Sequence, residues 1–273
     1  MTGVLRTKWS GGYLTYERPL VMGIVNVTPD SFSGGFTEKE AVEHAFKLID
    51  DGADIIDIGA ESTRPGWTPV SAVTEIDRLI PLIEAIAPSC DIPISVDTMK
   101  PDVAQAALDA GANIVNDING MRWDGMVDVI ASNGVPVVIT HIHGDLDTMH
   151  NVTMGDNFLL EIKKFFNEQV EIALDAGISR DCIILDPGLG FGKTPEQNIE
   201  LLKSGSFFSD RFPVLIGASR KRFLMDLYGD RSDESSAKAA VIAIENGAHI
   251  VRVHEPKITI NRITGTAEVQ TSL

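Results

Sequence analysis

Polar side chains that can bind or react follow the short apolar runs of this 273-residue chain, with one set after each run. The sets are Asn26, Asp57 with Glu61, Asp97, Asn116 with Asp117, His141 with His143, Asp186, Ser219 with Arg220, Lys221 and Arg222, and Arg252 with His254. A single Asp or Asn at such a position often only caps a helix or forms a turn. So many sets in succession favour a functional site, because parallel strands bring their carboxyl ends to one edge.

Three of these residues suit a planar ring with adjacent N–H donors. Asp97 and Asp186 supply carboxylates, and Asn116 supplies an amide. A carboxylate accepts two parallel hydrogen bonds from a guanidine-like edge. The residue types therefore predict a nitrogen heterocycle as ligand.

The cations at the same strand ends indicate a second kind of ligand. Arg64, Arg220, Lys221, Arg252 and His254 form a predicted anion-binding set. The whole chain carries a formal net charge of −16, which repels polyphosphate backbones and argues against nucleic-acid binding. Local cations in an acidic chain focus anions into a cleft, so we expect a small phosphate-bearing substrate.

Three loops are richer in chemistry than simple connections. Residues 28–36 and 61–67 both mix Gly, Pro, hydroxyls, charge and an aromatic ring, and we expect them to cover the site. Residues 188–193 are glycine-rich but lack the spacing of a phosphate-binding loop. We expect this third loop to approach Asp186 closely.

Eight β-then-α units position these groups. The expected strands are residues 20–27, 54–59, 93–97, 113–118, 136–141, 182–186, 213–217 and 248–254. Most are apolar almost throughout, as in a parallel sheet that is buried on both faces. Val42, Ala45, Phe46 and Ile49 recur at helical spacing after the first strand. Thr194 with Pro195 and Gln197 predicts a helix start with a capping box.

These units predict an α/β fold, a (β/α)₈ TIM barrel in one domain spanning residues 1–273. An open doubly wound sheet is the alternative, and it is disfavoured because no G-x-G-x-x-G follows the first strand. Residues 4–16, with Gly11 and Gly12, predict a small N-terminal β-hairpin that covers the barrel floor. We expect the final helix, after His254, to be brief.

Composition favours a globular cytoplasmic protein. Hydrophobic residues make up 44% of the chain and charged residues 23%, which is enough for a sizeable core. The apolar runs fall far short of the ~20 residues of a membrane helix, and residues 1–12 hold no signal-peptide core. The two cysteines, Cys90 and Cys182, have no metal-type spacing and fit a reducing compartment.

Several motifs in a fixed order carry a resemblance that covers nearly the whole chain. They are MGIVNVTPDSFS at 22–33, ESTRPG at 61–66, VD at 96–97, NDI at 116–118, DPG at 186–188 with GKT at 192–194, SRK at 219–221 and RVH at 252–254. The chain resembles the dihydropteroate synthases, transferases of folate biosynthesis. These enzymes condense 6-hydroxymethyl-7,8-dihydropterin diphosphate with p-aminobenzoate and release 7,8-dihydropteroate and diphosphate.

The resemblance implies a role for each matching residue. The pterin ring is expected to bind Asp97, Asn116, Asp186, Phe191 and Lys221. The diphosphate is expected to bind Asn26, Thr63, Arg252 and His254, with Asn26 also a ligand of a Mg²⁺ ion. p-Aminobenzoate is expected to bind Phe32, Arg64, Pro65 and Lys221. The residues implied to act in catalysis are Asp30, Arg64, Lys221, Arg252 and His254.

The implied mechanism is loss of diphosphate from the pterin methylene carbon, followed by attack of the neutral aromatic amine on the resulting cation. It requires no strong base. Mg²⁺, Arg252 and His254 stabilise the departing anion, and Asp30 faces the cation. The resemblance also implies a homodimer.

The chain departs from the family pattern after the fifth strand. Thr140-His141-Ile142-His143 stands where the family commonly has Met-His-Met, so the resemblance does not define this wall of the pterin pocket. Arg222 replaces a common Ser. Two other functions stay as alternatives: a pterin-binding methyltransferase domain, and a non-catalytic pterin-binding subunit.

Overall fold

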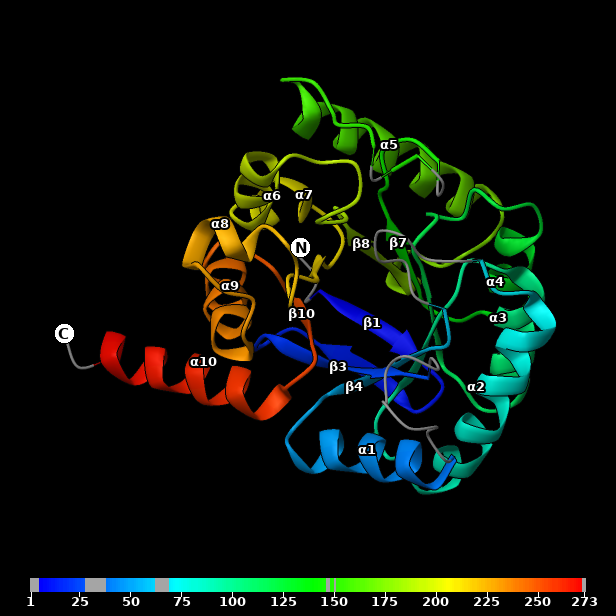
Figure 1. The fold of residues 1–273 in the computed structure, drawn as a ribbon. Helices are drawn as coiled ribbons and strands as arrows, with labels where there is room; N and C mark the ends of the chain where they lie inside the picture. The colour runs from blue at the N-terminus through cyan, green and yellow to red at the C-terminus, as the bar shows by residue number, and fades with distance from the viewer. Residues whose placement is uncertain (1–4, 28–37, 62–68, 146–147, 150, 272–273) are drawn as a thin grey trace.

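Eight parallel strands form the centre of the computed structural model, which describes residues 5–27, 38–61, 69–145, 148–149 and 151–271 (Figure 1). In chain order they are β3 (Leu20–Asn26), β4 (Ile55–Gly59), β5 (Ile94–Asp97), β6 (Ile114–Asp117), β7 (Val137–Thr140), β8 (Ile183–Asp186), β9 (Leu215–Ile216) and β10 (Ile250–Val253). Each pairs with the next from β3 to β8, and β10 pairs with both β3 and β9. A parallel bridge from Leu185 to Val214 joins the remaining edges, so the sheet is a barrel.

All eight predicted strands are present, and the predicted (β/α)₈ barrel is confirmed. The main difference is β9, a strand of two residues preceded by the Val214 bridge, in place of the five residues predicted. The helices that cover the barrel are α1 (Glu38–Asp50), α2 (Ala72–Ile86), α3 (Pro101–Asp109), α4 (Met126–Asn133), α5 (Phe158–Asp175), α6 (Pro195–Leu202), α7 (Gly205–Phe208), α8 (Leu224–Tyr228), α9 (Asp233–Glu245) and α10 (Pro256–Thr271), with 3₁₀ turns η1 (Ala87–Ser89) and η2 (Arg180–Cys182). None of the helices in the described ranges combines the length and apolarity needed to cross a bilayer.

The strands alternate between two separate apolar cores, because successive side chains of a strand point to opposite faces. Ile56 and Ile58 of β4 belong to the outer core, between the strands and the helices. Ile55 belongs to the inner core inside the barrel. The inner core consists of Leu20, Met22, Ile55, Ile114, Val138, Ile184, Leu215 and Ile250.

Polar residues occupy the next inward position on most of these strands. Two residues after the inner core come Asp57, Asn116, Thr140, Asp186 and Arg252. All but Arg252 are buried, and Arg252 is half-buried. The barrel interior is therefore apolar near the amino ends of the strands and polar near their carboxyl ends.

A hairpin closes the apolar end of the barrel, as the sequence predicts. Strands β1 (Arg6–Trp9) and β2 (Gly12–Thr15) pair antiparallel. Leu14 and Tyr16 pack against the inner core. The hydroxyl groups of Tyr16 and the fully buried Thr7 lie 2.6 Å apart in a hydrogen bond, which fixes the second strand on the first.

Two predictions about helices have different outcomes. The capping box is confirmed: Thr194 Oγ1 accepts a hydrogen bond from Gln197 N, and Gln197 Oε1 accepts one from Thr194 N. The prediction of a brief final helix is wrong, because α10 runs over 16 residues from Pro256. Figure 1 shows its C-terminal part extending beyond the barrel.

Candidate functional site

Four strands contribute side chains to one hydrogen-bonded network at the polar end of the barrel. Arg252 of β10 donates from Nε to Asp57 Oδ2 of β4 at 2.5 Å, and from Nη2 to Asp97 Oδ2 of β5 at 2.6 Å. Asn116 of β6 donates from Nδ2 to the same Asp57 Oδ2 at 3.0 Å. The structure thus brings Asp97, Asn116 and Arg252 together around a fully buried carboxylate that the sequence left without a role.

This network holds two carboxylates beside one guanidinium. Burial raises the pKa of Asp97, the Arg252 charge lowers it and the Asp57 charge raises it, to about 7. Burial by itself lowers the pKa of Arg252, but Asp57 and Asp97 together raise it above its ordinary value. Asp97 therefore changes its charge near neutral pH while Arg252 stays charged.

Asp186 and Lys221 form the second part of the site. Asp186 Oδ1 accepts a hydrogen bond from Gly188 N at 2.8 Å. Burial raises the pKa of Asp186, and the Lys221 charge lowers it again. Burial lowers the pKa of Lys221 to about 8, although Asp186 opposes that shift. The Arg252 charge lowers the pKa of both Asp186 and Lys221, and Asp186 raises the pKa of Arg252. The two parts of the site are therefore electrostatically coupled.

The glycine-rich segment 188–193 lies beside Asp186, as predicted. Gly188 has a φ of +68°, and a Cβ there would come within 1.9 Å of His141 O, so only glycine fits. Lys221 Nζ donates to Leu189 O and lies 4.6 Å from the centre of the Phe191 ring. The segment therefore holds the predicted ring-binding residues Phe191 and Lys221 against each other.

Lys193 stabilises this segment through buried hydrogen bonds, a role that the sequence did not predict. Its Nζ lies 2.9 Å from the carbonyl oxygens of Gly188 and Phe191, and 3.1 Å from His141 Nδ1. Burial lowers the pKa of Lys193 well below its ordinary value. The available signal was the position of Lys193 at the end of a glycine-rich run, whose free carbonyl groups need a donor.

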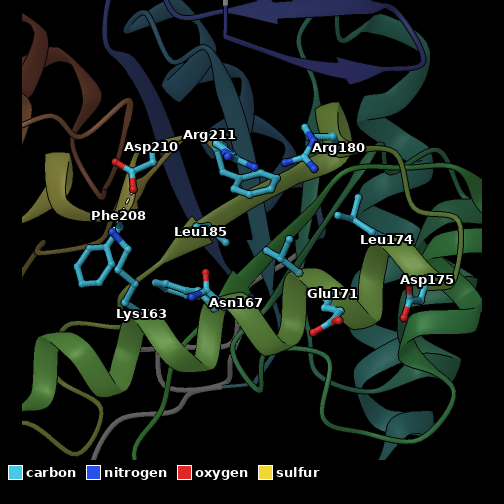
Figure 2. Close-up of a pocket in the computed structure, with 13 residues that line it drawn as sticks. Lys163, Asn167, Glu171, Leu174, Asp175, Arg180, Leu185, Phe208, Asp210 and Arg211 are labelled. Atoms are coloured by element: carbon cyan, nitrogen blue, oxygen red, sulfur yellow. Dashed lines mark hydrogen bonds and ion pairs between the residues drawn. The ribbon is translucent and has the colours of Figure 1, made fainter.

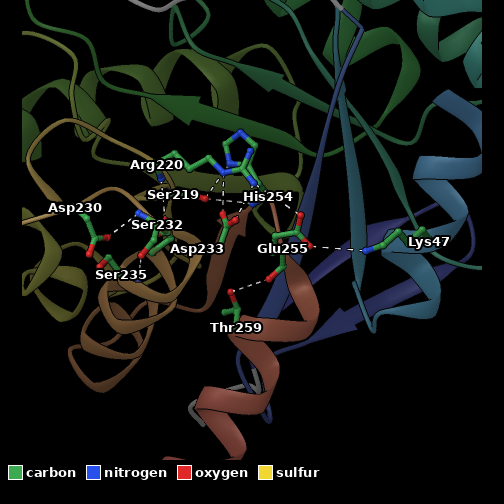
Figure 3. Close-up of polar contacts among 11 residues, drawn as sticks. Lys47, Ser219, Arg220, Asp230, Ser232, Asp233, Ser235, His254, Glu255 and Thr259 are labelled. Carbon is green, nitrogen blue, oxygen red and sulfur yellow. Dashed lines mark hydrogen bonds and ion pairs between the residues drawn. The ribbon is translucent and has the colours of Figure 1, made fainter. Parts of the chain in front are cut away.

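The anion-binding set is only partly assembled. Ser219 Oγ lies 2.9 Å from His254 Nδ1, beside the end of β10 (Figure 3). Arg220, predicted to bind an anion, instead donates to the Asp233 carboxylate at 2.8 and 3.0 Å. Its φ of +57° lies in the left-handed region, and its anion-binding role stays a prediction. Arg222 is exposed.

Glu61 also turns away from the ring-binding residues. Its side chain is 5% exposed and contacts Lys100 Nζ, which also donates to the fully buried Glu75 at 2.6 Å. Glu61 Oε1 accepts a hydrogen bond from Val70 N at 2.9 Å. Glu61 thus joins the end of β4 to the start of α2 and to the turn after β5.

The remaining predicted residues divide into one that is described and five that are not. Asn26 lies at the end of β3 and is half-buried. Asp30, Phe32, Thr63, Arg64 and Pro65 lie outside the described residues, as do most of the two predicted covering loops. Within the described ranges, no three His, Cys, Asp or Glu side chains gather as a metal cluster.

A groove of about 430 Å³ on the outer surface is separate from this site (Figure 2). Phe166 of α5, Leu185 of β8, and Phe208 and Phe212 line it. Leu185 belongs to the outer core, whereas its neighbour Asp186 faces inward. The wall of the barrel therefore stands between the groove and the polar network.

Comparison with known proteins gives consistent matches along the chain. Residues 22–254 match the model of the family described as "Pterin binding enzyme". The dihydropteroate synthase of Escherichia coli is 42% identical over 257 residues, covering 92% of this chain and 91% of the relative. That of Bacillus subtilis is 43% identical over 265 residues, covering 94% and 90%.

Solved structures agree with the sequence matches. The Xanthomonas albilineans dihydropteroate synthase with 4-aminobenzoic acid has a TM-score of 0.91 and 40% identity, and the match covers 98% of both chains. The same enzyme in complex with 7,8-dihydropteroate has a TM-score of 0.87 and 38% identity, covering 97% of this chain and 98% of the other.

Proposed function

Because the chain belongs to the pterin binding enzymes, and within them to the dihydropteroate synthases, we propose that the polar end of its barrel carries out the synthase reaction. The reaction joins 6-hydroxymethyl-7,8-dihydropterin diphosphate to p-aminobenzoate and releases 7,8-dihydropteroate and diphosphate. The main support is the grouping of Asp97, Asn116, Asp186, Lys221 and Arg252 around one mouth.

The pterin ring binds to the acceptors at the bottom of this mouth. Asp97 and Asp186 accept hydrogen bonds from the ring N–H groups, and Asn116 adds an amide. The Lys221 ammonium donates to Leu189 O and is influenced by the Asp186 charge, which places it beside the ring-binding carboxylate. From there it donates to a ring acceptor. Phe191 packs beside the ring.

The diphosphate leaves toward the cations of β10. Arg252 and His254 stabilise the negative charge that develops on the leaving oxygen. Thr63 is expected to complete this subsite. The methylene carbon keeps a positive charge that the ring shares, and Asp30, which lies outside the described residues, is the group that the resemblance implies for stabilising it. The amine of p-aminobenzoate, held by Phe32, Arg64, Pro65 and Lys221, forms the new C–N bond and releases a proton.

Mg²⁺ fits the oxygen donor available at this mouth. Asn26 offers an amide oxygen at the end of β3, the strand that pairs with β10. Mg²⁺ keeps several waters and substrate phosphates as ligands, so one protein ligand is sufficient. When bound, the ion would stabilise negative charge on the diphosphate.

A direct assay tests the proposed function and its alternatives. Purified protein is incubated with dihydropterin diphosphate and p-aminobenzoate, with Mg²⁺ or with EDTA, and dihydropteroate and diphosphate are quantified. We expect both products with Mg²⁺ and a large loss with EDTA. Pterin binding without products indicates a non-catalytic subunit, and methyl transfer from a methylated pterin indicates a methyltransferase domain.

The pH profile of kcat/KM is expected to be bell-shaped, with limbs near the pKa values of Asp97 and Lys221. Below about pH 7, Asp97 gains a proton and no longer accepts two hydrogen bonds. Above about pH 8, Lys221 loses its charge. Steady-state rates between pH 5.5 and 9.5 measure both limbs. A flat profile across that range would contradict the roles of both residues.

Assembly, domain count and location remain predictions of this proposal. We expect a single domain over residues 1–273, a homodimer, and a cytoplasmic protein without a nucleic-acid or membrane partner. Light scattering during size-exclusion chromatography distinguishes a dimer from a monomer.

A further inference from the structure

Asp57 lies at the centre of the network, between Arg252 and Asn116. The residue is fully buried, and its Oδ2 accepts from both Arg252 Nε and Asn116 Nδ2. Its Oδ1 is buried and has no hydrogen-bond partner among the described groups. One carboxylate oxygen therefore holds two residues of the proposed site, which come from strands on either side of β4.

The bond to Arg252 fixes the direction of the guanidinium. Nε is the nitrogen closest to the side-chain stem, so a bond at 2.5 Å there sets the plane of the whole group. The same plane then carries Nη2 to Asp97 at 2.6 Å. Without the Asp57 oxygen, Arg252 has a single anchor and more rotamers.

The bond to Asn116 fixes which way the amide faces. A carboxylate oxygen accepts hydrogen bonds and has no proton to donate, so the Asn116 nitrogen points toward Asp57. The Asn116 oxygen is thereby turned away from Asp57. A ring N–H donor then meets an acceptor and not a second donor.

A contribution to folding stability does not by itself explain why a carboxylate is buried at position 57. A buried ion pair contributes little net stability, because the desolvation of two charges offsets their attraction. Asp57 Oδ1 adds a buried acceptor without a partner, which costs free energy. The preceding inward residue, Ile55, shows that the barrel interior accepts an apolar side chain one layer below.

We propose that Asp57 is a positioning residue of the synthase reaction, which orients Arg252 toward Asp97 and the leaving group and turns the Asn116 oxygen toward the pterin ring. The proposal rests on the proposed function. Asp57 acts through these two neighbours and does not itself contact substrate.

Asp57→Asn tests the proposal, since it keeps the shape and removes the charge. The amide oxygen can still accept, but the negative charge that strengthens both hydrogen bonds and attracts the guanidinium is lost. We expect kcat to fall about 10- to 100-fold, the range typical when the partner that orients a functional group is lost. The dissociation constant for the pterin should rise, and KM for p-aminobenzoate should change little.

The acid limb of the pH profile is the second readout. A purely structural role for Asp57 would leave the pH of this limb unchanged. The charged groups that act on Asp97 are Arg252, Asp57, Glu75 and Asp117. Asp57 raises the pKa of Asp97, so its removal shifts the acid limb to lower pH. Asp57→Glu keeps the charge but displaces the oxygens, so kcat should fall while the acid limb stays in place.

Asp210→Asn is the matched control. Asp210 pairs with Lys163 on the outer surface and is 69% exposed, so wild-type kinetics are expected. Wild-type kcat and an unmoved acid limb in Asp57→Asn would overturn the proposal. So would failure of both Asp57 variants to fold, judged by circular dichroism and thermal unfolding, because the role would then be structural. An inactive wild-type protein would instead refute the proposed function.

Discussion

The Arg252→Ala enzyme is expected to turn over about 100 to 1,000 times more slowly than the wild type, the usual cost of losing one preorganised donor to a developing anion. Arg252 is the cation that the structure holds most firmly at the mouth, with two charged hydrogen bonds of 2.5 and 2.6 Å. Asp57 and Asp97 raise its pKa above the ordinary value, which keeps it charged near neutral pH. Single-turnover rates with saturating substrates measure the loss directly.

Removal of Arg252 also leaves Asp57 and Asp97 without their counter-ion. Loss of one partner of a buried pair costs about 3–5 kcal/mol, so urea unfolding must accompany the kinetics. Arg252→Lys keeps a charge but cannot reach both carboxylates with a planar fork, and it should be intermediate in rate. Turnover of Arg252→Ala at the wild-type rate would remove the residue from the anion subsite.

Asp186→Asn is expected to weaken pterin binding about 10- to 150-fold, as a hydrogen bond to a charged group contributes about 1.5–3 kcal/mol. The fold should persist, because the amide oxygen can still accept from Gly188 N. Isothermal titration with a non-reactive pterin gives the affinity. Asp181→Asn, in which the replaced carboxylate pairs only with the nearby Ser179 hydroxyl among described groups, is the control. Unchanged affinity in Asp186→Asn would rule out its pterin-binding role.

The strands and the mouth residues could be predicted because their signals are local. Apolar runs such as Ile183 to Leu185 mark a buried strand, and the polar residue that follows, here Asp186, marks its carboxyl end. The closure of the barrel then brings the ends together whatever the loops contain. For this reason Asp97, Asn116, Asp186, Lys221 and Arg252 could be placed together from the sequence.

Pairing within the site could not be predicted, because the partners are far apart in the chain. Asp57 and Arg252 are separated by 195 residues, so no spacing rule connects them. Arg220 shares its charge and its strand-end position with the predicted anion set, but its ion pair with Asp233 of α9 has no signal in that pattern. Lys193 is close in sequence to its partners, yet its burial behind the loop depends on His141 from another strand.

Among the described residues, the inner apolar layer and the hairpin beneath it close one end of the barrel. For the proposed reaction, we therefore expect the substrates to enter and the products to leave through the polar end. This geometry predicts an order of binding, in which the molecule that binds deeper enters first.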